Sequence, residues 1–136
     1  MGHLMAVPLP RTVQWLIGLS VLSFLFTVPH AAEDFLHGEA ARLGLNNTAM
    51  AVGLAVAYAG QALGLALSAR QNRVGHLAHL ALGLVWCIGA VVIHLPEVLA
   101  PGPYREGPAS QIFLFGVIIS TGALAAASLL ALRGLR

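Results

Sequence analysis

Charged residues are scarce in this sequence of 136 residues, and lysine is absent. Only 9% of the residues are charged, whereas a soluble domain usually carries about 25%. This number of charges is too small to cover a water-facing surface. We therefore predict that lipid solvates most of the chain. The net charge of +2 comes from scattered arginines rather than from a basic patch, and it therefore indicates no nucleic-acid partner.

Cysteine is almost absent as well. The single cysteine, Cys87, excludes a disulfide within the chain. The sequence also lacks a Walker-type glycine loop, a Rossmann fingerprint and a Gly-x-Ser-x-Gly motif, which are typical of nucleotide-binding proteins and serine hydrolases. Those classes are set aside.

Long apolar runs are what the sequence does contain. They cover about residues 12–30, 48–69, 74–95 and 111–132, and each is long enough to cross a hydrocarbon core of about 30 Å as a helix. In lipid the backbone must satisfy its own hydrogen bonds, which favours helices. We predict an all-α, polytopic membrane protein with four transmembrane helices in an antiparallel bundle, forming a single domain over residues 1–136. We expect the first run to be retained rather than cleaved, because His30 is unsuited to the position three before a cut after Ala32.

The arginines predict the orientation. Four spans place both termini on one side, and that side carries five of the seven arginines: Arg11, Arg70, Arg73, Arg133 and Arg136. All five acidic residues fall on the other side. By the positive-inside rule, we expect both termini to be cytoplasmic in an inner (plasma) membrane.

Small residues at spacings of three and four predict where helices pack. One such face of the second span comprises Gly53, Ala57, Gly60, Gly64 and Ser68, and one of the fourth comprises Gly116, Ser120, Ala123 and Ala127. Small side chains let helix backbones approach closely in lipid. The partner helix can belong to the same chain, to a homo-oligomer or to a larger membrane complex.

A polar stripe leads to the candidate site. The first span carries Ser20, Ser23, Thr27, His30, Asp34 and His37 on one helical face, with Glu33 beside it. The third span carries His94 and Glu97 near its outer end. Both spans run outward, so the topology brings their ionisable groups to one depth. Such groups are costly near lipid, so we predict a functional site here.

Two kinds of chemistry suit that site. Imidazole and carboxylate together ligate a divalent transition metal, zinc or iron, and the predicted ligands are His30, Glu33, Asp34, His94 and Glu97. Alternatively, His30, Glu33 and Asp34 act as catalytic acid and base groups. The other ionisable residues of that side, Glu39, His37 and Glu106, are interpreted as wet interfacial residues, as is His3.

Two further histidines, His76 and His79, lie beside the inner arginines. They are interpreted as interfacial residues, with a second ion or a haem as the alternative. Haem ranks behind a directly bound ion, because His76 has no histidine partner on another helix at its own depth.

The run His30-Ala31-Ala32-Glu33-Asp34 resembles the motif of the HXXEE family of small, multi-helix bacterial membrane proteins. The match covers five residues and a similar helix count, and it departs at Asp34, which keeps the carboxylate but shortens its reach. The resemblance implies that the functional residues are those of the motif, and it names no reaction.

Three functions are therefore carried forward. The first is a metal or acid–base site at the outer end that acts on a membrane-soluble substrate. The second is a non-catalytic subunit or scaffold of a larger complex. The third is a small proton or ion transporter that uses Ser20, Ser23, Thr27 and His30 and requires a homo-oligomer. Whether the protein is an enzyme stays open.

Overall fold

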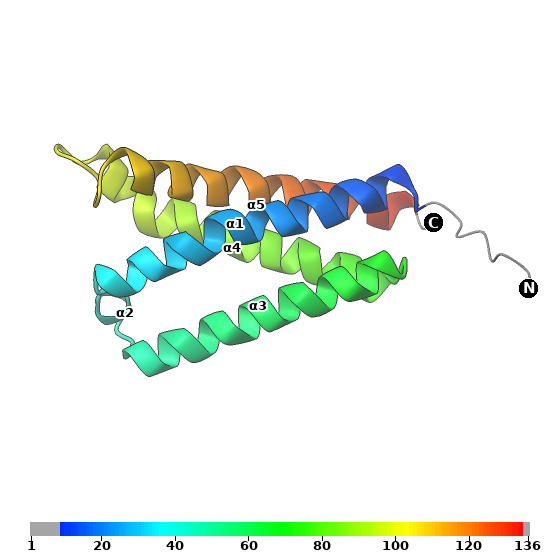
Figure 1. The fold of residues 1–136 in the computed structure, drawn as a ribbon, viewed down its shortest axis with the longest axis horizontal. Helices are drawn as coiled ribbons and strands as arrows, with labels where there is room; N and C mark the ends of the chain where they lie inside the picture. The colour runs from blue at the N-terminus through cyan, green and yellow to red at the C-terminus, as the bar shows by residue number, and fades with distance from the viewer. Residues whose placement is uncertain (1–8, 135–136) are drawn as a thin grey trace, which may run out of the picture.

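The computed structural model describes residues 9–134, so His3 and Arg136 lie outside the described part. Its helices are α1 (Arg11–Leu36), α2 (Glu39–Arg42), α3 (Asn47–Ala69), α4 (Arg73–Leu99) and α5 (Pro108–Gly134). No strand occurs among these residues. The four long helices are apolar enough to span a membrane, and they pack into one antiparallel bundle (Figure 1). The predicted all-α, four-span fold is confirmed.

The helices extend beyond the predicted spans. We expected the third to end before Pro96, but α4 continues through it to Leu99, because a proline removes only its own backbone donor and the remaining hydrogen bonds can continue. Likewise, α1 runs through Pro29 to Leu36. Gly38 then adopts a left-handed conformation, with φ of 69°, which suits a glycine just after the end of a helix. The short helix α2 was not predicted.

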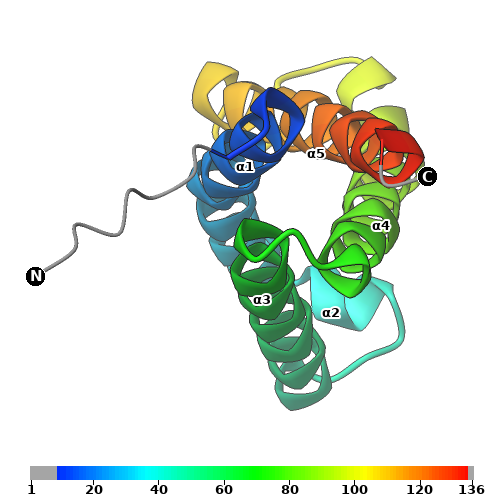
Figure 2. The ribbon, with the colours of Figure 1, turned by 90° about the vertical axis from the view of Figure 1, so that its right-hand side faces the viewer.

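The bundle forms a ring in the order α1, α5, α4 and α3 (Figure 2). The most extensive contacts join α5 to α4 and to α1. Helix α3 packs along α4, but it diverges from α1 towards α2 (Figure 1). Consequently α1 and α4 face each other diagonally, with α5 closing one side between them and α3 closing the other only in part.

The small-residue faces are used within the chain. A Cβ at Gly75 of α4 would lie 2.5 Å from the backbone N of Ser68, and a Cβ at Gly64 would meet Ala78 and His79 of α4. By contrast, a Cβ at Gly53 would meet nothing within 4 Å, because this part of α3 has diverged from the bundle. On α5, Gly116 lies against the ring of Phe26 in α1.

The interior contains two separate apolar clusters. One apolar cluster comprises Ala90, Tyr104, Leu114 and Val117, and another comprises Leu16, Leu124 and Ala131. The former lies at the acidic end, which we define as the end with the α1–α2–α3 and α4–α5 connections. The opposite, terminal end holds Arg11, the α3–α4 connection and Arg133.

Candidate functional site

Two imidazoles from diagonally opposed helices meet inside the acidic end. The ring centroids of His30 in α1 and His94 in α4 lie 4.7 Å apart, edge to face at 81°. Both residues are buried, with 2% and 3% of their surface exposed. The predicted convergence of these two histidines is therefore present in the structure.

Asp34 joins this pair. Its Oδ1 lies 3.7 Å from His94 Nε2 and 4.0 Å from His30 Nε2. One nitrogen or oxygen from each of the three residues fits within 4.8 Å of the others, which is close enough for one metal ion. Asp34 is four residues after His30 on the same helix, so both project from one face.

Glu33 does not belong to that group. Its Oε1 accepts a hydrogen bond of 3.0 Å from Ser110 Oγ at the start of α5. One residue along a helix turns the side chain by about 100°, so Glu33 faces α5 while Asp34 faces the bundle axis. Its predicted role as a ligand stays a prediction, although the structure separates it from the two histidines.

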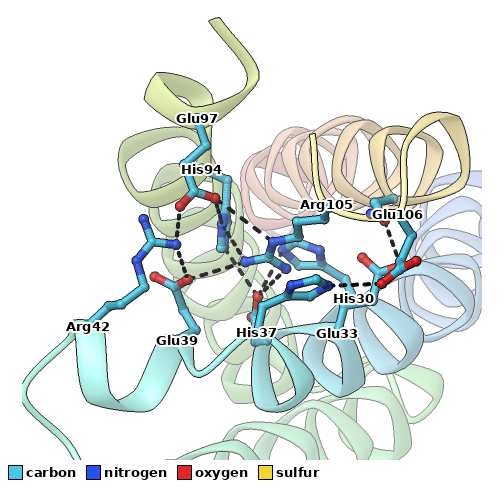
Figure 3. Close-up of polar contacts among 11 residues, drawn as sticks. His30, Glu33, His37, Glu39, Arg42, His94, Glu97, Arg105 and Glu106 are labelled. Atoms are coloured by element: carbon cyan, nitrogen blue, oxygen red, sulfur yellow. Dashed lines mark hydrogen bonds and ion pairs between the residues drawn. The ribbon is translucent and has the colours of Figure 1, made fainter. Parts of the chain in front are cut away.

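The interpretation of Glu39 as a wet interfacial residue is wrong, because only 3% of its surface is exposed. The chain turns at Gly38, and α2 then folds back over the end of the bundle, which carries Glu39 inward (Figure 3). Its Oε2 accepts a hydrogen bond of 3.1 Å from Arg42. Glu97 pairs with Arg42 as well. Glu39, His94 and Glu97 form a second set of atoms close enough for one ion.

Arg105, which sequence reasoning did not select, lies at the centre of these groups (Figure 3). Only 5% of its side chain is exposed. Its Nη1 donates to Asp34 Oδ1 at 2.8 Å, and its Nη2 lies 3.3 Å from Glu39 Oε2 and 3.2 Å from His94 Nδ1. The backbone of Arg105 is left-handed, with φ of 44°, a conformation uncommon for residues other than glycine. The turn therefore aims the guanidinium inward.

The contact between Arg105 and His94 fixes a tautomer. A guanidinium has only donors, so His94 Nδ1 must be the acceptor and the proton of a neutral ring resides on Nε2. That Nε2 faces Asp34. A metal ion would need an unprotonated nitrogen, so in this geometry neither nitrogen of His94 is free to ligate. The arrangement therefore favours a proton-transfer site over a metal site.

The loop before α5 holds Arg105 in place. Tyr104 is buried, and the guanidinium carbon of Arg105 lies 5.2 Å from the centre of its ring. Burial raises the pKa of Tyr104 to about 12, so this phenol is neutral at physiological pH. On the rim, the hydrogen bond to Glu97 and the charge of Glu39 raise the pKa of Arg42.

His30 differs from His94, because neither of its ring nitrogens has a hydrogen-bond partner among residues 9–134, although both are buried. It lies at one end of a cavity of about 190 Å³ between α1 and α4. The cavity is lined by His30, Asp34, Val85, Trp86, Gly89, Ala90, Ile93 and His94. Most of this lining is apolar, so the free imidazole borders a space suited to an apolar molecule.

Three aromatic rings cross the bundle next to this cavity. Tyr58 of α3 stacks on Phe24 of α1, with centroids 5.7 Å apart, and packs against Trp86 of α4 at 5.6 Å. Beyond Tyr58, towards the acidic end, α3 diverges from α1. Val85, which lines the cavity, is 67% exposed, so this part of the lining faces the outside of the bundle.

The other predicted residues lie apart from this site. His37 Nε2 lies 3.6 Å from Glu106 Oε1, and both side chains are partly exposed, as expected of interfacial residues. The interfacial interpretation of His76 and His79 is wrong, because they are 1% and 0% exposed. The close approach of α3 and α4 at Gly64 and Gly75 covers them.

Comparisons with known proteins give no match. No family model matches the chain, and neither a curated protein nor a solved structure is similar to it.

Proposed function

We propose that this membrane protein carries a metal-free acid–base site at its acidic end, where His30 exchanges a proton with a membrane-soluble substrate. The observation that carries the proposal is the different state of the two imidazoles. Arg105 occupies His94 Nδ1, whereas both nitrogens of His30 are unpartnered beside the cavity. An imidazole with a free nitrogen beside an apolar cavity is suited to general acid–base catalysis.

In this proposal the surrounding residues position the imidazoles. Arg105 orients His94 and donates a charge-assisted hydrogen bond of 2.8 Å to Asp34. Asp34 in turn faces Nε2 of both histidines. His30 takes a proton from the substrate at one nitrogen, or returns it there, and the carboxylate stabilises the imidazolium in between.

The substrate class follows from the cavity. Its lining combines Val85, Trp86 and Ile93 with one polar end, and Val85 is exposed on the outside of the bundle. An apolar molecule with a weakly acidic C–H bond next to a polar group such as a carbonyl fits this lining, and it would enter sideways from the lipid. The resemblance to the HXXEE family selects His30, Glu33 and Asp34, two of which form this site.

Deuterium exchange tests the proposal without knowledge of the substrate. Purified protein is incubated in D₂O buffer with total membrane lipids of the cells that naturally make it, and mass spectrometry identifies lipids that gain deuterium. We expect one lipid class to gain deuterium with the wild type and with His37→Gln. His30→Gln should abolish the gain. Equal lipid labelling with and without His30 would refute the acid–base role.

A metal site is the second candidate, because His30, Asp34 and His94 present ligand atoms within 4.8 Å of one another. Two histidines and one carboxylate are typical of iron and, with a water molecule, of zinc. Arg105 would first have to leave His94. We therefore expect purified protein to hold less than one equivalent of zinc or iron by elemental analysis. One equivalent that disappears in His30→Ala but persists in His37→Ala would establish the metal site instead.

We also propose that the termini are cytoplasmic and that the acidic end faces outward in the plasma membrane. The support is the placement of Arg11, Arg70, Arg73 and Arg133 at the terminal end. A cytoplasm-active reporter fused after residue 136 should be functional. Activity only from a reporter that requires export would reverse the orientation and place His30 near the cytoplasmic side.

A further inference from the structure

A second feature of the interior is a column of polar side chains that runs from the terminal half of the bundle to the acidic-end site. It begins with Ser68, His76 and His79, and it continues through Gln61, Ser20, Ser23 and Thr27 to His30. All of these residues are buried, with at most 2% of their surface exposed. Polar residues inside a membrane span are costly, and they usually mark a functional path.

The terminal half of the column is formed by α3 and α4. His76 Nδ1 lies 3.1 Å from Ser68 Oγ, and His79 is one turn further along α4. The ring of His79 lies against Gly64, where an added Cβ would be 3.5 Å from Nε2. Gln61 is the next buried residue on this face of α3, so it follows His79 in the direction of the acidic end.

Gln61 links this half to α1. Its Nε2 donates to Ser23 Oγ at 2.5 Å and lies 3.3 Å from Ser20 O. From Ser23, the polar face of α1 leads by way of Thr27 to His30. Seven residues separate Ser68 from Gln61, and seven separate Ser23 from His30. At about 1.5 Å per residue these stretches cover about 20 Å, roughly two thirds of a hydrocarbon core.

Many polar atoms along the column have no hydrogen-bond partner in the part of the chain that the structure describes. They are Ser20 Oγ, Thr27 Oγ1, Gln61 Oε1 and both ring nitrogens of His30 and His79. The buried hydroxyls of α5 differ from those of Ser20 and Thr27, because Ser120, Thr121 and Ser128 each donate to a carbonyl of their own helix. In the column, Ser23 Oγ does the same towards Ser20 O at 2.8 Å. A buried polar atom without a partner costs about 1–3 kcal/mol, and such atoms are the usual ligands of internal water.

We propose that this column is a hydrated proton path through a single chain, connecting the terminal half of the bundle with His30. Water molecules bridge the unpartnered atoms. Imidazole and hydroxyl groups both donate and accept hydrogen bonds. Each group can therefore accept a proton from one neighbour and release a different proton to the next neighbour. Each transfer leaves an imidazole in its other tautomer or a hydroxyl turned round, and reorientation of the group and its water resets it before the next proton passes. No other reactant is consumed. The proposal does not rest on acid–base catalysis at the acidic end.

Proton flux into liposomes tests the path. Full-length protein is reconstituted around the pH dye pyranine, a potassium diffusion potential is imposed with valinomycin, and the internal pH is followed. We expect acidification faster than in protein-free liposomes, without leakage of carboxyfluorescein. Gln61→Leu and His79→Gln should reduce the flux to the protein-free rate. The matched control is Gln14→Leu, because the Gln14 side chain is exposed and, within the described part of the chain, bonds only to Leu9 O. This variant should retain the wild-type flux.

Two results would overturn the proposed proton path. Wild-type flux equal to that of protein-free liposomes overturns the path, as does wild-type flux in both Gln61→Leu and His79→Gln. Each variant is first checked for monodispersity and for its unfolding midpoint, and His79→Gln retains a polar side chain if Gln61→Leu fails to fold. Failure here is distinguishable from failure of the acid–base site, because lipid deuteration depends on His30 and is measured without a membrane potential.

Discussion

Replacing Arg105 by methionine should destabilise the bundle strongly, although the residue lies in a loop. Methionine keeps much of the apolar stem and removes the guanidinium. The carboxylate of Asp34 then loses its closest partner, at 2.8 Å, while Glu39 keeps Arg42 at 3.1 Å. Removing one member of a buried ion pair costs about 3–5 kcal/mol, a change of about 100-fold to several thousand-fold in the unfolding equilibrium.

The assay is unfolding of the purified protein in mixed micelles by increasing SDS, followed by tryptophan fluorescence. Arg42→Met is the matched control, because Arg42 also contacts Glu39 but 53% of its side chain is exposed. Exposed ion pairs contribute about 1 kcal/mol or less, so this variant should remain close to the wild type.

A double-mutant cycle then assigns the loss. Coupling between Arg105→Met and Asp34→Asn should be large, and coupling between Arg105→Met and Glu106→Gln should be negligible, because 73% of the Glu106 side chain is exposed. A cost below about 1 kcal/mol for Arg105→Met, or equal costs for Arg105→Met and Arg42→Met, would refute the central role of the guanidinium.

Further predictions concern packing, pH and the cavity. Gly75→Ala should destabilise the protein by about 1–3 kcal/mol, because its Cβ would lie 2.5 Å from Ser68 N. The control Gly53→Ala should be neutral or stabilising. Equal SDS unfolding midpoints for the two variants would contradict the close α3–α4 contact. Tyr104 has a folded-state pKa of about 12 against about 10 when unfolded. The contribution of neutral Tyr104 to the free energy of unfolding is therefore complete below about pH 10 and should be lost as the pH rises towards 12. The Tyr104→Phe variant should not show this loss. In a Trp15→Phe background, Trp86 is the sole tryptophan, and lipids brominated on their acyl chains should quench its fluorescence. Gly89→Leu should reduce this quenching, because Gly89 and Trp86 line the same cavity and the leucine would fill it. Unchanged quenching would mean that lipid chains do not enter the cavity.

The sequence alone determined the four spans, because long apolar runs admit few other structures in lipid. It also placed His30, Asp34 and His94 at one depth, since helical periodicity and topology fix the height of a residue in a bundle. The spacing of the small residues also predicted close helix contacts at Gly64 and Gly116, although it did not specify which helices they contact. These predictions use short-range rules that hold wherever a helix crosses a bilayer.

Only the tertiary structure placed Arg105 and Glu39 in the site. Both belong to connections, α2 and the loop before α5, and no periodicity fixes how a connection folds back over the end of a bundle. Periodicity also does not specify how a helix is rotated about its own axis within the bundle. This rotation directs Glu33 towards Ser110 and buries His76 and His79 between α3 and α4. Depth along a span follows from local sequence, whereas the direction of a side chain around it depends on which neighbours pack there.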